Sequence, residues 1–145
     1  MEHGEAACQR ATMTEVLALA VVVLTGLYFI ALAVASLFTP ERVNRFLLGF
    51  AGSAPKHYFE LFSRLVVGGA LVLHAPRMLF ADAFTVFGWA LLITTTCLLV
   101  MPWQWHNRFA RRSVPRATRH ITLVGLASLV IGGFILVAVA RGSAG

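Results

Sequence analysis

The fold is decided by an uncharged stretch of about 23 residues, VLALAVVVLTGLYFIALAVASLF, at positions 16–38. The hydrocarbon core of a bilayer is about 30 Å thick, and about 20 apolar residues in a helix cross it. Backbone polar groups in hydrocarbon must be hydrogen-bonded within the segment, and an isolated span achieves this only as a helix. The stretch therefore predicts a transmembrane helix, which Thr39 and Pro40 end.

Three further stretches have the length of a span. Residues 58–80 and 83–101 are apolar with a few polar interruptions, and residues 121–140 carry no charge. Hydrophobic residues make up 59% of the 145-residue chain and charged residues only 12%, whereas soluble domains are about 25% charged. We therefore expect an all-α protein, a four-helix transmembrane bundle over residues 14–141 with no separate soluble domain.

The two ends of the chain are expected to lie outside this bundle. Residues 1–13 are predicted to be a disordered tail, and residues 142–145 a second tail. No cleavable signal peptide is expected, because Glu2, Glu5 and Glu15 stand where a signal sequence needs positive charge.

The net charge of +6 comes from eleven arginines and one lysine. Such a balance raises the question of nucleic-acid binding, but the basic residues sit in short loops between apolar stretches, so no nucleic-acid partner is expected. The first and third loops hold eight of them, against Arg10, Arg77 and Arg141 on the other side. The positive-inside rule then predicts a multi-pass protein of the cytoplasmic (inner) membrane with both termini outside.

The two basic loops are expected to lie on the membrane surface. In the first, Val43, Phe46, Leu47 and Phe50 recur at helical spacing, which predicts a short interfacial helix. The second combines arginine with tryptophan, as is typical of a cytoplasmic interface. An interface with anionic lipid headgroups or with a protein partner is predicted at Arg42, Arg45, Trp103, Trp105, Arg108, Arg111 and Arg112.

The two halves of the chain are similar at a shift of 62 to 64 residues. Residues 44–46 and 107–109 both read NRF, and VGG at 67–69 matches IGG at 131–133. The pattern indicates two duplicated helical hairpins related by an axis near the membrane normal. Coincidence between two hydrophobic hairpins is the alternative.

Small residues form a stripe on the second and fourth predicted spans. Small side chains allow helix backbones to approach closely in a membrane, and we expect these two spans to meet there in the centre of the bundle. A notch that admits a substrate is the alternative. The predicted helix-packing residues are Gly68, Gly69, Gly125, Ser128, Gly132 and Gly133.

A candidate polar site within the membrane is formed by Glu60, Arg64 and His74. Glu60 and Arg64 are four residues apart, with the acid first, which is the favourable order for an ion pair on a helix. Ionisable residues inside a span usually face the interior or a wet cavity. Structural pairing is one interpretation, and a role in transport or ligand binding is the other.

Sequence motifs for catalysis or for metal binding were not found. The chain has no nucleophile elbow, phosphate loop or HExxH sequence, and His57, His106 and His120 have no ligand partners at suitable spacing. Cys8 and Cys97 are expected to be unpaired. The predictions are therefore no enzymatic activity, no metal and no cofactor.

The chain resembles the small, mostly uncharacterised four-helix inner-membrane proteins of bacteria. RLVVG at positions 64–68 and HAPRM at positions 74–78 are also similar to the first-helix pattern of DoxX-like membrane proteins. In that family three helices follow this pattern, and here two follow it. The resemblance implies a membrane bundle but no defined reaction, and no residue roles are carried over.

Two functions are consistent with these observations. The first is a non-enzymatic accessory or scaffold subunit, which forms a homo-oligomer or binds another membrane protein through helix packing. The second is a small-solute or ion transporter or channel, which acts as an oligomer with Glu60 and Arg64 along its path.

Overall fold

A computed structural model describes residues 2–50, 54–100 and 120–142. Four long helices are present: α1 (Glu2–Phe38), α3 (Ala54–His74), α4 (Ala81–Val100) and α6 (Ile121–Gly142). The helix α2 (Pro40–Phe50) follows α1, and the short 3₁₀ helix η1 (Ala75–Arg77) follows α3. The described ranges contain no strand, so the predicted all-α fold class is confirmed.

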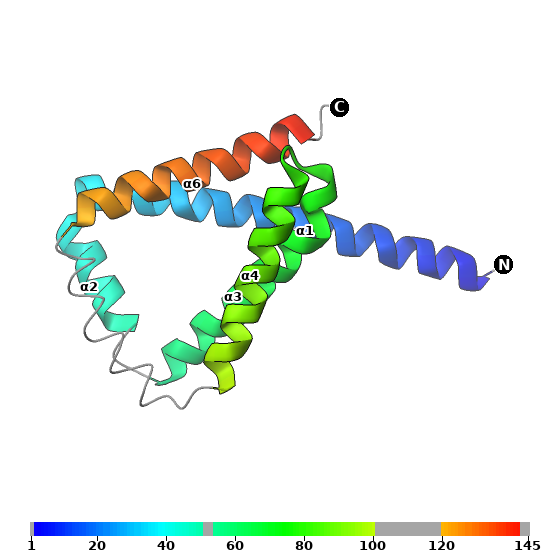
Figure 1. Cartoon of the computed structure of the whole chain (residues 1–145), viewed down its shortest axis with the longest axis horizontal. Coiled ribbons are helices and arrows are strands. Elements are labelled where there is room, and N and C mark those ends of the chain that lie inside the picture. The colour runs from blue at the N-terminus through cyan, green and yellow to red at the C-terminus, as the bar shows by residue number, and fades with distance from the viewer. Residues whose placement is uncertain (1, 51–53, 101–119, 143–145) are drawn as a thin grey trace.

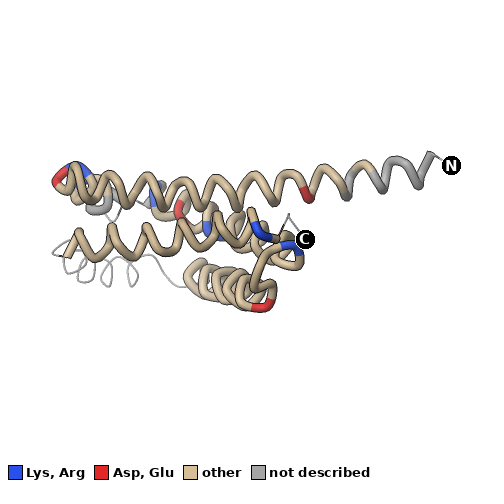
Figure 2. The backbone as a smooth tube through the Cα atoms, turned by 90° about the horizontal axis from the view of Figure 1, so that it is seen from above, with Lys and Arg blue, Asp and Glu red and all other residues tan. Residues whose placement is uncertain are grey.

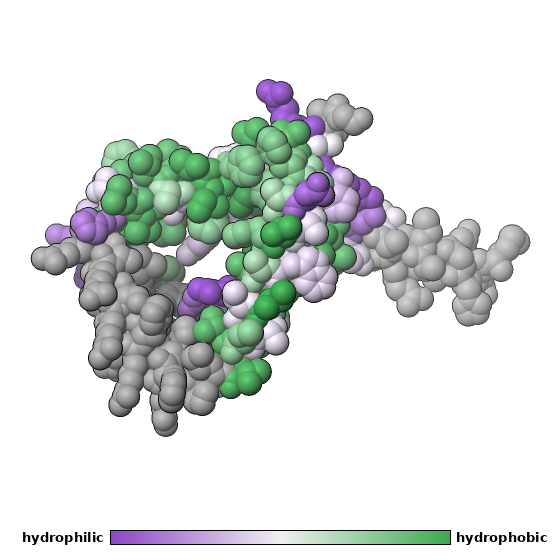
Figure 3. Space-filling view, in the orientation of Figure 1, coloured by the Kyte–Doolittle hydropathy of each residue, from purple (hydrophilic) through white to green (hydrophobic). Residues whose placement is uncertain are grey.

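Each long helix contains a segment long and apolar enough to cross a bilayer. These segments are Thr12–Phe38, Pro55–Arg77, Ala81–Val100 and Ile121–Gly142. Only 17% to 33% of each segment is buried inside the chain, and Figure 3 shows hydrophobic side chains over most of the visible helix surface. A water-soluble protein rarely exposes apolar patches of this size. The chain therefore has the architecture of a multi-pass membrane protein.

The helices are arranged in two antiparallel pairs. Helix α1 packs along α6, and α3 packs along α4, while the two pairs cross each other at an angle (Figure 1). Figure 2 shows a long uncharged stretch in α1 and another in α6. The closest packing therefore joins the first span to the last and the second to the third.

The two pairs meet in an apolar core at one end of the molecule. This core contains residues from all four long helices, among them Val22, Leu71, Phe84 and Ile135. The connection between η1 and α4 closes it, because the backbone N–H of Leu79 donates to the carbonyl of Ala138 on α6, at 3.0 Å. We call this region the closed end.

Phe80 makes the turn at the closed end. Its φ of 63° lies in the left-handed region, which costs a residue with a side chain roughly 1 kcal/mol. The Phe80 ring stacks on Phe134 of α6 with centroids 5.7 Å apart, and Phe84 stacks on the same ring at 5.4 Å. These contacts offset the cost of the backbone conformation and fix α6 against the start of α4.

Away from the closed end the two pairs diverge (Figure 1). Helix α2 leaves α1 just after Thr39 and turns towards the start of α3. The sequence predicted a helix in this loop, and α2 is that helix.

The first residues of the chain differ from the prediction. A disordered tail was expected over residues 1–13, whereas α1 begins at Glu2. The physical reason is local composition: Ala6, Ala7, Gln9 and Arg10 have high helix propensity, and no proline interrupts the approach to the apolar stretch. Helix already formed at residue 16 therefore propagates backwards, adding one hydrogen bond for each residue fixed.

Candidate functional site

The contact between α1 and α6 is made by glycine backbone. A Cβ atom added at Gly132 would lie 2.8 Å from the carbonyl oxygen of Gly26, and one added at Gly125 would lie 2.9 Å from the Cβ of Ser36. Ser128, between these two glycines, is buried. Only residues without a side chain fit at such distances, so these positions set the separation of the two helices.

The contact between α3 and α4 is built in the same way. A Cβ atom added at Gly88 would lie 3.0 Å from the carbonyl oxygen of Gly68, and one added at Gly68 would lie 3.2 Å from the carbonyl oxygen of Gly88. The sequence predicted that Gly68 and Gly132 would bring α3 and α6 together. That prediction of partners was wrong, because each glycine packs against a different helix, α4 or α1. A small-residue stripe marks a close contact but carries no information about which neighbour fills it.

The second glycine of each pair has no such contact. A Cβ atom added at Gly69 or at Gly133 would meet nothing within 4 Å. On α3, Gly69 shares its face with the exposed Phe62 and Leu73, and on α6, Gly133 shares its face with the exposed Val130. Both glycines were predicted to pack, and both lie on outward faces within this chain.

The polar pair predicted on α3 is formed. Nη2 of Arg64 donates to Oε1 of Glu60 at 2.5 Å. The two side chains remain 43% and 36% exposed, so the ion pair is not enclosed by the chain. The carboxylate of Glu60 also acts electrostatically on the hydroxyl of Tyr28 on α1.

Arg64 lies well inside the span that contains it. The span begins at Pro55 and ends at Arg77, so Arg64 is nine residues from one end and thirteen from the other. Nine residues of helix measure about 13.5 Å, close to half of the roughly 30 Å hydrocarbon core. This depth raises the cost of leaving the pair in contact with lipid.

His74 lies at the closed end, far along α3 from Glu60 and Arg64. It is buried, with 7% of its surface exposed, and it interacts electrostatically with Arg77 and Glu15. Nη2 of Arg77 is 2.7 Å from Oε1 of Glu15, so this ion pair joins η1 to α1. The three residues predicted as one polar site thus belong to two separate places.

The sequence did not predict a role for Tyr28 or Glu15, or a groove beside α2. Tyr28 is an aromatic residue in an otherwise uncharged span, and Glu15 precedes the apolar stretch by one residue. The only signal for Glu15 was an acidic residue placed next to a span, and nothing in the sequence linked it to Arg77, which is sixty-two residues further along.

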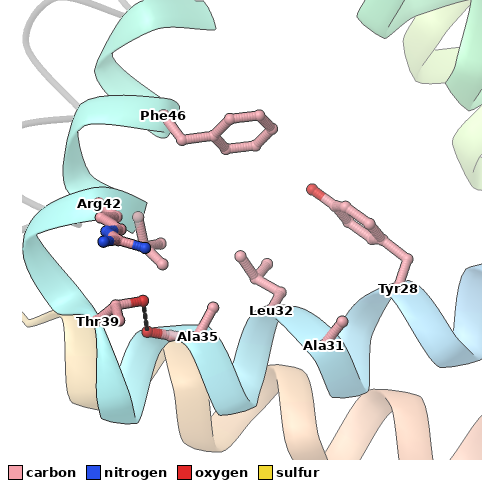
Figure 4. Close-up of a pocket in the computed structure, with 8 residues that line it drawn as sticks. Tyr28, Ala31, Leu32, Ala35, Thr39, Arg42 and Phe46 are labelled. Carbon is pink, nitrogen blue, oxygen red and sulfur yellow. Dashed lines mark hydrogen bonds between the residues drawn. The ribbon is translucent and has the colours of Figure 1, made fainter.

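A groove of about 400 Å³ lies in the corner between α1 and α2 (Figure 4). We call it the α1–α2 groove. Arg42 lines it, whereas Arg45, on the same helix, is exposed outside it. The lining residues are Tyr28, Ala31, Leu32, Ala35, Thr39, Arg42, Val43 and Phe46.

The remaining predicted interface residues belong to the loop that precedes α6. Trp103, Trp105, Arg108, Arg111 and Arg112 lie outside the described residues. Among residues 2–50, 54–100 and 120–142, no group of three or more His, Cys, Asp or Glu side chains is placed to hold a metal ion.

Comparisons of the chain with protein-family models, with curated proteins and with solved structures find no match. The likeness to DoxX-like membrane proteins therefore stays a prediction from the two short sequence patterns on α3.

Proposed function

We propose that the protein is a non-enzymatic accessory or scaffold subunit that binds another membrane protein, or another copy of itself, within the bilayer. The observation that carries this proposal is the Glu60–Arg64 ion pair, which is more than one-third exposed inside a membrane span, five and nine residues from its start at Pro55. It lies in the first half of α3, and the start of α3 is where the two helix pairs are apart (Figure 1).

Such a pair is costly to leave against lipid tails. A charged side chain at the centre of a span costs about 2.5 to 3.5 kcal/mol on insertion scales. Pairing Glu60 with Arg64 lowers this cost but leaves further donors on the guanidinium group. A polar residue on a partner helix would supply the missing acceptors, and buried interhelical hydrogen bonds are a known source of affinity in membranes.

The closed end argues against a path through one copy of the chain. The core there is apolar and contains well-buried side chains such as Val22, Leu71 and Ile135. A polar solute that reached Glu60 and Arg64 would meet this core before it reached His74. Packing against a partner requires no such path.

The proposed location is the cytoplasmic (inner) membrane, with both termini outside and anionic lipid headgroups around the basic loops. The support for this orientation is the distribution of lysine and arginine, eight in the first and third loops against three on the other side. On this arrangement the closed end is the outer end, because α1 reaches it from the N-terminal side.

A duplicated hairpin is part of the same proposal. At a shift of 62 residues Gly26 corresponds to Gly88, and at a shift of 64 residues Gly68 corresponds to Gly132. The Gly26–Gly132 contact joins α1 to α6, and the Gly88–Gly68 contact joins α4 to α3. Exchange of the two proposed repeats converts one contact into the other, which is the relation expected of a twofold internal repeat.

The test is the assembly state of the protein in mild detergent. We expect the native chain to be recovered as a homo-oligomer or with a membrane protein in fixed stoichiometry, and the double variant Glu60→Gln/Arg64→Gln to lose that assembly. The matched control is Glu15→Gln/Arg77→Gln, which removes an ion pair of the same kind at the closed end. A native chain that is monomeric and without a partner would contradict the proposal.

A transporter or channel, acting as an oligomer, is the second candidate. The observation that favours it is the Glu60–Arg64 pair, which places a carboxylate and a guanidinium inside one span without enclosing them in the chain. In proteoliposomes, Arg64→Leu should abolish solute flux while Arg77→Leu retains it. Equal flux through the native chain and Arg64→Leu would remove Arg64 from any such mechanism.

A further inference from the structure

We infer that the α1–α2 groove is a binding site for one anionic phospholipid, with the phosphate at Arg42 and one acyl chain along α1. This inference is independent of the partner proposed above. It starts from the distribution of polar and apolar groups along the groove.

The groove is lined almost entirely by apolar surface, and Arg42 lies at one of its ends. Arg42 and Thr39 lie at the end where α2 begins, and Leu32 and Ala31 form the wall that continues along α1 (Figure 4). The Thr39 hydroxyl already donates to the carbonyl of Ala35 at 3.1 Å. The guanidinium of Arg42 is therefore the group in this groove that would hold an anion.

The depth of the groove matches one leaflet. From Thr39 to Tyr28 there are eleven residues of α1, or about 16 Å of helix, which is about half of the roughly 30 Å hydrocarbon core. A ligand with its charge at Arg42 would therefore have its chain at the depth that a lipid tail normally occupies.

Two aromatic rings give the groove its width. The rings of Tyr28 and Phe46 project from α1 and α2 into the open space (Figure 4), and both side chains are about half exposed. Val43 of α2 is buried and also lines the groove. The space between the rings is lined by methyl groups and ring faces, which suits a hydrocarbon chain.

Charge decides between an anionic and a zwitterionic headgroup. Arg42 and Arg45 are both exposed on α2, and a basic residue at a membrane surface is worth about a fivefold gain in binding to anionic lipid. The nearby Glu41 is exposed as well and does not line the groove. An anionic headgroup is therefore favoured at Arg42.

The experiment measures retained lipid. The full chain is reconstituted into vesicles of equal parts phosphatidylglycerol and phosphatidylcholine, extracted in mild detergent, and analysed by native mass spectrometry. We expect one phosphatidylglycerol per chain in preference to phosphatidylcholine. Arg42→Gln should lower that retention about fivefold, and Ala31→Phe should abolish it by filling the groove.

Two matched variants separate a site from general surface charge. Arg45→Gln removes the same charge from the same helix outside the groove, and Ala20→Phe adds the same ring at an exposed position of α1. Arg45→Gln should lower phosphatidylglycerol retention less than Arg42→Gln does, and Ala20→Phe should leave it unchanged. Equal losses in Arg42→Gln and Arg45→Gln, unchanged retention in a folded Ala31→Phe, or equal retention of the two lipids would each overturn the inference.

The lipid site and the partner proposal fail in different ways. Arg42→Gln should leave the assembly state in detergent unchanged, and Glu60→Gln/Arg64→Gln should leave phosphatidylglycerol retention unchanged. If Ala31→Phe does not fold, Arg42→Gln and Arg45→Gln still decide the question, because both residues are exposed. Displacement of the lipid only when a partner protein binds would identify the groove as part of the protein interface instead.

Discussion

The α1–α6 pair and the α3–α4 pair use the same contact but carry different side chains. In each pair a glycine of one helix lies against a glycine carbonyl of the other, at Gly132 on Gly26 and at Gly88 on Gly68. Between Glu15 and Glu41 the first pair has no charge on α1, whereas α3 carries Glu60 and Arg64 inside its span. The glycine contact is therefore common to both helix pairs, whereas the ion pair inside a span is a feature of α3.

The largest expected effect tests the α1–α6 contact. Gly132→Val places side-chain atoms where a Cβ would already be 2.8 Å from the Gly26 carbonyl oxygen, and backbone cannot move aside as a flexible side chain can. We expect a loss of about 3 kcal/mol or more in the free energy of unfolding, measured by titration with denaturing detergent. The adjacent Gly133→Val, which meets no atom within 4 Å at its Cβ, should unfold as the native chain does.

A smaller loss is expected at the equivalent position of the α3–α4 pair. At Gly88 the nearest neighbour of an added Cβ is Cγ2 of Val72 at 2.8 Å, and the Gly68 carbonyl follows at 3.0 Å. Gly88→Ala should destabilise the chain by about 1 to 3 kcal/mol. Part of this loss should be recovered in Gly88→Ala/Val72→Ala, which removes the movable neighbour. If Gly88→Ala lowered the free energy of unfolding more than Gly132→Ala does, the α3–α4 contact would be the less tolerant of the two, contrary to this prediction.

Reversal of the polar pair separates structural pairing from partner recognition. Glu60→Arg/Arg64→Glu keeps an ion pair at the same spacing, with the order that is less favourable by a few tenths of a kcal/mol on a helix. We expect nearly native unfolding but loss of the assembly seen in mild detergent. If the variant with the reversed pair keeps that assembly, Glu60 and Arg64 form an ion pair within α3 but do not recognise a partner.

The smallest effect is expected at the closed end. Glu15 and Arg77 are about half exposed, and exposed ion pairs contribute little because water and salt screen them. Glu15→Gln should change the unfolding midpoint slightly at low salt and not at all at high salt. A large change at both salt concentrations would indicate that this ion pair, more than the apolar core, holds η1 against α1.

The four spans were predictable because each depends only on the length and hydrophobicity of its own segment. Uninterrupted apolar length identifies residues 16–38 without reference to any neighbour, and the same holds for α6. The ion pair between Glu60 and Arg64 was predictable for the same reason, since both residues lie on one helix at a spacing of four.

Helix pairing was not predictable in this way. Lipid tails are as apolar as leucine, so burial does not select a partner for a helix in a membrane. Gly68 and Gly132 were recognised as packing residues, but their neighbours on α4 and α1 depend on how the pairs cross. The α1–α2 groove and the Glu15–Arg77 ion pair also depend on how the helices are arranged in space, so the sequence alone did not predict them.

The turn at Phe80 has a geometric consequence for the opposite end of the molecule. The two helix pairs are joined near this turn, and a helix of about 20 residues extends about 30 Å from it. A rotation of about 10° at the turn would therefore displace the distant helix ends by about 5 Å. A small change in how the rings of Phe80 and Phe84 pack on Phe134 would therefore produce a larger displacement of α2 and of the start of α3.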